Sequence, residues 1–154
     1  MILLDSDVLM IELRYPYDRK ASRNRLALQT IQADGIALGV TAQVLLEVVG
    51  NLSFNTSRAQ VSRLPHTIIT SYNLTVLPNL STNPDYAGCT VAELITQMSQ
   101  QMSLADAVQA VQIAHHAPTA ICLLTWNARH FVGKLVISAL TPDEWLNQRA
   151  GKTP

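Results

Sequence analysis

Two aspartates stand one residue apart where the first apolar run of the chain ends. Asp5 and Asp7 follow the residues MILL, and apolar character resumes in VLM directly after Asp7. One aspartate would be enough to cap a helix or a turn at this point, so the second needs another explanation. With further acids brought to the same place, the pair could hold a divalent cation.

A third candidate acid stands alone in an apolar segment. Glu47 is the only charged residue between Asp34 and Arg58, and it lies within VLLEVV. A lone buried carboxylate is unfavourable by several kcal/mol unless it is paired or binds a metal. The alternative is a narrow solvated helix face that Glu47 shares with Gln43 and Asn51.

The fourth candidate acid is Asp106, in SLADAVQAVQIA. Ser103 and Asp106 match the S-x-x-D pattern of a helix start, which alone would explain the acid. Asp5, Glu47 and Asp106 are nevertheless three of only eleven acids in the chain, and all stand at starts or interiors of predicted helices. Carboxylates gathered in an apolar globule repel one another unless a cation holds them, and oxygen ligands without His or Cys favour Mg²⁺ or Mn²⁺. Such an ion activates water and neutralises a phosphodiester during its cleavage.

Short apolar segments alternate with helical ones and would position these acids. The pattern predicts strands at residues 1–4, 36–40, 74–77, 120–125 and 135–137, with helices from the first strand to about residue 14 and over 21–33, 41–52, 85–101 and 104–116. Thr41 and Thr141 are predicted helix caps, with Pro142 at the first position of a last helix. Residues 53–73 are ambiguous and fit one or two short helices.

This alternation indicates an α/β fold, a three-layer α/β/α sandwich around a mostly parallel five-stranded sheet. Sites in such folds gather at the carboxyl ends of the strands. Asp5 lies one residue past the first strand and Asn127 two past the fourth, so neighbouring strands would bring them together.

Length and composition are those of one compact domain, expected over residues 1–149 with a short tail at 150–154. The 154 residues are 48% apolar and 14% charged, with zero net charge, so any binding of nucleic acid would be local. No apolar run is long enough to span a bilayer and no signal peptide is evident, which favours a cytoplasmic protein. Cys89 and Cys122 have no metal-binding spacing and read as reduced thiols.

Five segments in this order and spacing resemble the PIN-domain family: MILLDSDVL, the isolated Glu47, SLADAVQAVQIA, LLTWNARHF and TPDEWL. The resemblance covers nearly the whole chain except residues 53–83. The family comprises Mg²⁺-dependent ribonucleases, including toxins of VapBC-type toxin–antitoxin pairs. The resemblance therefore implies a PIN-like fold and a metal-dependent endoribonuclease.

The resemblance also assigns roles to single residues. It places the three catalytic acids of the family at Asp5, Glu47 and Asp106, which would hold Mg²⁺ or Mn²⁺. Asp7 occupies a position where the family has Asn or Asp, and it is expected to cap the following helix while supporting the site. Thr125 is expected to support the site as well.

The family often has a fourth acid where this chain has Asn127. An amide reaches metal-bound water through its carbonyl but brings no charge, which argues against tight binding of a second ion. The expected partners are an RNA substrate, a second copy of the chain and a cognate antitoxin. The expected RNA contacts are Arg14, Arg19, Lys20 and Arg129.

Two other functions remain open on the sequence. A non-catalytic PIN-like module would use the same surface for binding or dimerisation, with Asn127 marking a weakened site. Asp5 and Asp7 also resemble the D-x-D start of haloacid-dehalogenase-type phosphatases. That chemistry needs a lysine after a later strand, and Lys20, Lys134 and Lys152 are not so placed.

Overall fold

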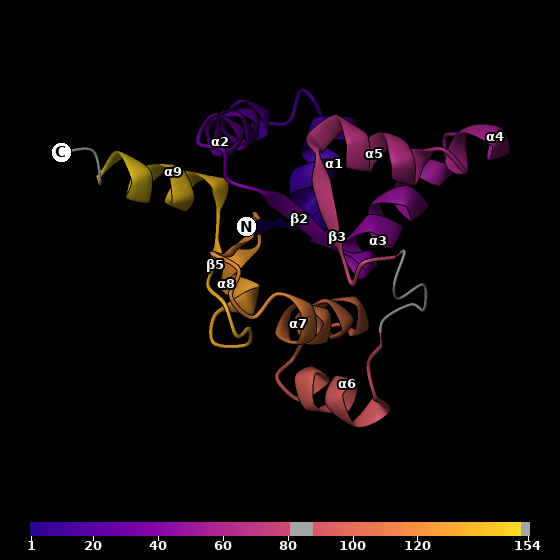
Figure 1. The fold of residues 1–154 in the computed structure, drawn as a ribbon, viewed down its shortest axis with the longest axis vertical. Coiled ribbons are helices and arrows are strands. Elements are labelled where there is room, and N and C mark those ends of the chain that lie inside the picture. The colour runs from indigo at the N-terminus through magenta and orange to yellow at the C-terminus, as the bar shows by residue number, and fades with distance from the viewer. Residues whose placement is uncertain (81–87, 152–154) are drawn as a thin grey trace.

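The computed structural model describes residues 1–80 and 88–151, in which strands and helices alternate (Figure 1). The strands are β1 (Ile2–Leu4), β2 (Leu38–Thr41), β3 (Leu74–Leu77), β4 (Leu123–Leu124) and β5 (Ala139–Leu140). The helices are α1 (Ser6–Leu13), α2 (Ala21–Ala33), α3 (Ala42–Ser53), α4 (Arg58–Val61), α5 (Leu64–Tyr72), α6 (Val91–Met98), α7 (Leu104–His116), α8 (Ala128–Phe131) and α9 (Pro142–Ala150).

Within the described residues the strands form one parallel sheet in the order β3-β2-β1-β4-β5. The first strand of the chain is therefore central, with Leu3 in register with Gly39 of β2 and Leu123 of β4. All carboxyl ends lie at one edge, and the strand order changes direction between β1 and β4. Open α/β sheets bind ligands at this switch point.

Helices cover both faces of the sheet, so the predicted three-layer α/β/α architecture is confirmed. Alternate side chains of β1 enter two separate cores. Ile2 and Leu4 pack in a core with α1, α2, α3, α5 and α9, and Leu3 packs in a second core with α7 and Phe131 of α8. Figure 1 shows α1, α2, α3 and α5 on one side of the sheet and α6, α7 and α8 on the other.

The predicted fifth strand at residues 135–137 was wrong. Those residues lie in a bend that follows Gly133, whose φ is 72°, and the strand forms at Ala139–Leu140 in register with β4. Leu135 and Ile137 are apolar because their side chains pack against the second core. Side-chain burial without strand pairing gives the same sequence pattern as a short strand.

The other predicted elements agree with the structure apart from their boundaries. The expected strand at 120–125 is reduced to Leu123–Leu124, and the helix expected from residue 85 begins at Val91, where Thr90 and Glu93 form a capping box. Residues 85–87 of that expected helix lie outside the described residues. Thr41 and Thr141 cap helices as predicted, and residues 53–73 contain α4 and α5.

No helix in the described part of the chain is long and apolar enough to cross a membrane. Neither Cys89 nor Cys122 forms a disulfide within the described residues, in agreement with the predicted reduced thiols.

The position of β2 between two neighbouring strands gives a stability prediction. We expect Gly39→Ala to lower the free energy of unfolding by about 1–3 kcal/mol, because its Cβ would lie 2.7 Å from Met1 Sδ, 3.1 Å from Leu3 Cδ2 and 3.2 Å from the Thr75 carbonyl oxygen. Gly50→Ala in α3 is the control, since its Cβ would meet nothing within 4 Å. The control should raise stability by about 0.5–1 kcal/mol. Urea unfolding measures both, and a Gly39→Ala protein as stable as the wild type would contradict the close strand packing.

Candidate metal-dependent active site

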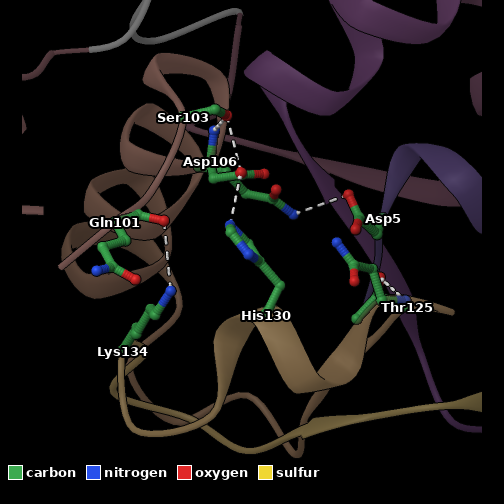
Figure 2. Close-up of polar contacts among 9 residues, drawn as sticks. Asp5, Gln101, Ser103, Asp106, Thr125, His130 and Lys134 are labelled. Carbon is green, nitrogen blue, oxygen red and sulfur yellow. Dashed lines mark hydrogen bonds and ion pairs between the residues drawn. The ribbon is translucent and has the colours of Figure 1, made fainter. Parts of the chain in front are cut away.

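Asp5 stands at the carboxyl end of the central strand and begins α1. Its side chain is the N-cap of the helix, with Oδ1 accepting a hydrogen bond of 2.8 Å from the Ser6 amide. Oδ1 also accepts a 3.4 Å bond from Nε2 of Gln109, a buried residue of α7 (Figure 2). Only 8% of Asp5 is exposed. Burial raises its pKa, the hydrogen bonds from Thr125, Ser6 and Gln109 lower it, and the charge of Asp106 raises it further.

Asp7 ties the first turn of α1 to the end of β4. Its Oδ2 accepts hydrogen bonds from the Trp126 amide at 2.9 Å and the Thr125 hydroxyl at 3.2 Å. The expectation that Asp7 caps the helix was wrong, because Asp5 is the N-cap and Asp7 lies two residues after it, in the first turn. Oδ1 of Asp7 is buried and accepts no hydrogen bond from the described residues. Burial and the charge of Asp5 raise the pKa of Asp7 to about 7, against the opposing effects of Thr125, Trp126 and Lys20.

Glu47 comes from α3 and points back to the start of α1. Its residue is exposed, yet Oε1 accepts a 3.0 Å hydrogen bond from the hydroxyl of Ser6, the residue next to Asp5. Partial burial raises the pKa of Glu47, the Ser6 bond lowers it, and the charges of Asp5 and Asp106 raise it. Glu47 therefore lies on the solvent side of the same group of acids.

Asp106 lies in the first turn of α7, which Ser103 caps, and its carboxylate is held by two side chains. Oδ2 accepts a 2.8 Å bond from the Ser103 hydroxyl and lies 3.1 Å from Nε2 of His130 (Figure 2). In the described part of the chain both side-chain bonds of this carboxylate end on Oδ2, which leaves Oδ1 available. No local pattern pairs His130 with Asp106, which stands 24 residues earlier.

Asn127 and Thr125 follow β4 at the same edge. Thr125 is buried, and its Oγ1 accepts a 3.1 Å bond from the Asn127 amide while donating to Asp7. The side chain of Asn127 is exposed at the start of α8 and makes no cap bond there. Thr125 thus links both aspartates of α1 to the turn that carries Asn127.

The predicted gathering of Asp5, Glu47 and Asp106 in one coordination shell was wrong for the side chains as they stand. Within residues 1–80 and 88–151, no three His, Cys, Asp or Glu side chains form a group that could hold a metal ion directly. Hydrogen bonds to Ser6, Gln109, Ser103 and His130 engage one oxygen of each of the three carboxylates.

The donor set nevertheless fits Mg²⁺ or Mn²⁺ in type and charge. All three groups are hard oxygen donors. Burial raises the pKa values of Asp5 and Glu47 and repulsion between the acids raises them further, so a cation between them would relieve that repulsion. Mg²⁺ keeps several of its waters and needs only one or two protein carboxylates. These residues therefore fit an ion held partly through water.

The four cations expected at RNA have different surroundings. Arg14 donates to the Asn51 carbonyl at 2.7 Å, and the Lys20 ammonium lies 5.0 Å from the Trp126 ring centroid. Arg19 and Arg129 are exposed, and neither takes part in an ion pair within the described residues. Two further arginines that follow Lys20 in the sequence form ion pairs: Arg23 with Asp143 and Arg25 with Glu12.

Comparison with known proteins supports the fold. No protein-family model and no curated protein sequence matches the chain. A chain in the crystal structure of VapBC2 from Rickettsia felis, bound to a DNA fragment from their promoter, matches with a TM-score of 0.62 and 18% identity over 92% of this chain and 98% of that one. A chain in the structure of FitAB bound to an IR36 DNA fragment matches with a TM-score of 0.60 and 15% identity, over 92% and 95%.

The matched chains have the PIN-domain fold, and this chain has a PIN-like α/β fold with its sheet in the order 3-2-1-4-5. The resemblance seen in the sequence motifs is thereby confirmed at the level of the fold. Because the identities are low, the function of the site is argued from its own residues below.

The raised pKa values predict how pH affects the metal-free protein. A carboxyl group with a raised pKa binds its proton more tightly in the folded chain than in the unfolded one, so the folded state loses stability as pH rises. For Asp7 the loss spans pH 3.8 to about 7, at about 1.4 kcal/mol for each unit of pKa elevation. Urea unfolding in the presence of a chelator should show this decrease in the free energy of unfolding as pH rises.

Asp7→Asn should reduce the pH dependence of the free energy of unfolding, since the variant has no proton to lose at that position. Glu93→Gln is the control, because hydrogen bonds from Thr90 lower the pKa of Glu93 instead of raising it. A metal-free wild type that gains stability between pH 4.5 and pH 7 would contradict the assignment of a desolvated acid at the switch point.

Proposed function

We propose that this chain is a Mg²⁺- or Mn²⁺-dependent endoribonuclease that hydrolyses RNA phosphodiester bonds and acts as the toxin of a toxin–antitoxin pair. One observation carries the proposal. Three acids from separate elements, Asp5, Glu47 and Asp106, lie close enough at the carboxyl edge of a PIN-like sheet for the charge of Asp106 to raise the pKa values of the other two.

The catalytic acids are Asp5, Glu47 and Asp106, and the exposed amide of Asn127 is a further ligand through its carbonyl oxygen. When bound, Mg²⁺ supplies an activated water and neutralises charge on the phosphodiester. The chain prepares the site by orienting carboxylates before the ion arrives. Ser103 and His130 fix one oxygen of Asp106 and direct the other away from them.

Supporting residues hold the remaining acids in place. Thr125 and the Trp126 amide restrain Asp7, which in turn keeps the first turn of α1 against β4. Gln109 restrains Asp5 from the opposite layer of the sandwich. Arg14, Arg19, Lys20 and Arg129 are the proposed contacts of the RNA backbone, because the neutral chain offers no overall attraction to a polyanion.

Replacement of any of the three acids tests the catalytic assignment. Asp5→Asn, Glu47→Gln and Asp106→Asn should each lower Mg²⁺-dependent cleavage of single-stranded RNA by at least about 100-fold. Removing a carboxylate also relieves repulsion, so the metal-free stability of each variant should equal or exceed that of the wild type. Cleavage is measured with a labelled RNA and stability with urea.

Asp34→Asn is the matched control, since Asp34 pairs with Arg149 at the surface and should not affect cleavage. If the three variants unfold, the acids serve capping and packing alone. If they remain folded and the wild type does not cleave RNA under any Mg²⁺ or Mn²⁺ concentration, the chain is the non-catalytic binding module instead.

We further propose that the chain forms a homodimer in the cytoplasm and is inhibited by a cognate antitoxin. Helix α6 has no buried residue in the described structure, and one face exposes Val91 by 73%, Ile95 by 62% and Met98 by 44%. A continuous apolar face of this kind favours association. Helix α2 offers less apolar surface, because its Leu28 and Ile31 are buried. An inhibitory partner would place an Arg or Lys side chain against the acids, where it would compete with the metal ion.

A charge on α6 tests the dimer. Ile95→Glu should shift the mass in solution from dimer to monomer, because a carboxylate in an apolar interface is left without a partner. Leu26→Glu on α2 is the control, since Leu26 is an exposed apolar residue of comparable size at 45% exposure. Light scattering at micromolar concentration gives the mass, and a monomeric wild type would reject the dimer.

A further inference from the structure

A cavity adjoins the candidate active site along the same edge of the sheet. It has a volume of about 270 Å³ and lies where β4 and β5 end. The residues that line it are Trp126, Asn127, Ala128, Arg129, Val132, Ala139, Leu140, Thr141 and Glu144. None of the roles argued above for the three acids requires this space.

Trp126 is the one aromatic residue of the lining, and it is held rigidly. Its indole Nε1 donates a 2.9 Å hydrogen bond to Oδ1 of Asn24, and its amide donates to Asp7. Asn24 is itself fully buried and fixed, because its Nδ2 donates to the Val8 carbonyl and to Glu12, both at 3.0 Å. The Lys20 ammonium lies over one face of the ring, 5.0 Å from its centroid, so a flat partner would stack on the opposite face. A preorganised aromatic ring binds such a partner with little loss of conformational entropy.

The lining carries one positive and one negative side chain, Arg129 and Glu144, which suit the phosphate and the base of a nucleotide respectively. The guanidinium of Arg129 is exposed and has no ion pair within the described residues, so it is available to an anion. Oε2 of Glu144 is engaged by the amide and hydroxyl of Thr141 at 2.7 and 2.9 Å, which fixes a negative charge in the lining. A phosphate would pair with Arg129 and avoid Glu144, whereas a neutral base with N–H donors suits the carboxylate.

We propose that this cavity binds a nucleobase of the RNA strand, stacked on Trp126, with the adjoining phosphate at Arg129. Stacking on an aromatic side chain is sequence-tolerant and is a general means of holding single-stranded RNA. Neighbouring strands of a sheet lie about 4.8 Å apart, so the end of β5 lies about 10 Å from Asp5 at the end of β1. A base in the cavity and the phosphodiester at the acids would therefore belong to nearby nucleotides of one strand, so the cavity would position the strand relative to the cleaved bond.

The choice of RNA as ligand rests on the proposed function, but the test measures binding without catalysis. Wild-type protein in a chelator is titrated with a short single-stranded RNA, with the same RNA carrying abasic nucleotides and with nucleoside 5′-monophosphates. Tryptophan fluorescence reports stacking. The chain has two tryptophans, so Trp145→Phe isolates the signal of Trp126, since Trp145 lies in the core and outside this cavity.

The intact RNA should quench Trp126, and Trp126→Leu should weaken its binding at least about fivefold. Arg129→Gln should weaken binding while leaving the quenching at saturation unchanged, because it removes a phosphate contact and not the stack. Arg63→Gln, which replaces an exposed arginine at the start of α5 and outside the cavity lining, is the control and should bind like the wild type.

Equal quenching by abasic RNA would overturn the proposal, as would unchanged RNA affinity in both Trp126→Leu and Arg129→Gln. Monophosphates that bind as tightly as the RNA would assign the cavity to a free nucleotide and overturn the role in strand binding. Should Trp126→Leu fail to fold, the abasic RNA and Arg129→Gln still decide the question. Base-dependent quenching in a protein that never cleaves RNA would refute the proposed ribonuclease and leave the base-binding cavity standing.

Discussion

The burial of one carboxylate at the end of the central strand is the constraint on which the rest of the site depends. Asp5 is 8% exposed and follows a strand that has neighbours on both sides. A carboxylate in this position is unfavourable unless hydrogen bonds and opposite charge surround it. The fold supplies hydrogen bonds from two directions, from the amide of Ser6 in α1 and from Nε2 of Gln109 in α7. Opposite charge is what these residues do not supply, and the neighbouring acids make its absence more costly.

The distribution of basic residues is consistent with that requirement. The chain has no net charge, and three of its arginines are engaged with acids at the periphery: Arg23 with Asp143, Arg25 with Glu12 and Arg149 with Asp34. Such exposed pairs add little to stability. Lys20 and Arg129, which lie near the carboxyl edge, form no ion pair within the described residues and offset part of the negative charge of the acids there. In a neutral protein, such cations would be the local contacts of a polyanion.

The sequence predicted the fold and the candidate acids because both depend on local patterns. Apolar segments of strand length, helix caps at Thr41 and Thr141 and isolated acids are all visible without knowledge of distant contacts. The errors arose where burial or pairing is set by residues far apart. Leu135 and Ile137 are buried by packing on the second core rather than by strand pairing, and the cap of α1 is Asp5 because β1 ends at Leu4. His130 and Asn24 were missed for the same reason. A histidine or asparagine acquires its role from a partner many residues away, and no periodicity marks it.

The segment TWNARHF shows why a short turn after β4 has effects across the whole edge. Thr125 and the Trp126 amide reach Asp7, while His130 reaches Asp106 in the opposite layer. Between them, Trp126 and Arg129 face the cavity toward β5. Because α8 is a single turn, a change in any of these contacts would shift the others. The same few residues would therefore set the orientation of a catalytic carboxylate and the position of the bound strand, so RNA binding at the cavity and ordering of the acids would be coupled through one rigid turn.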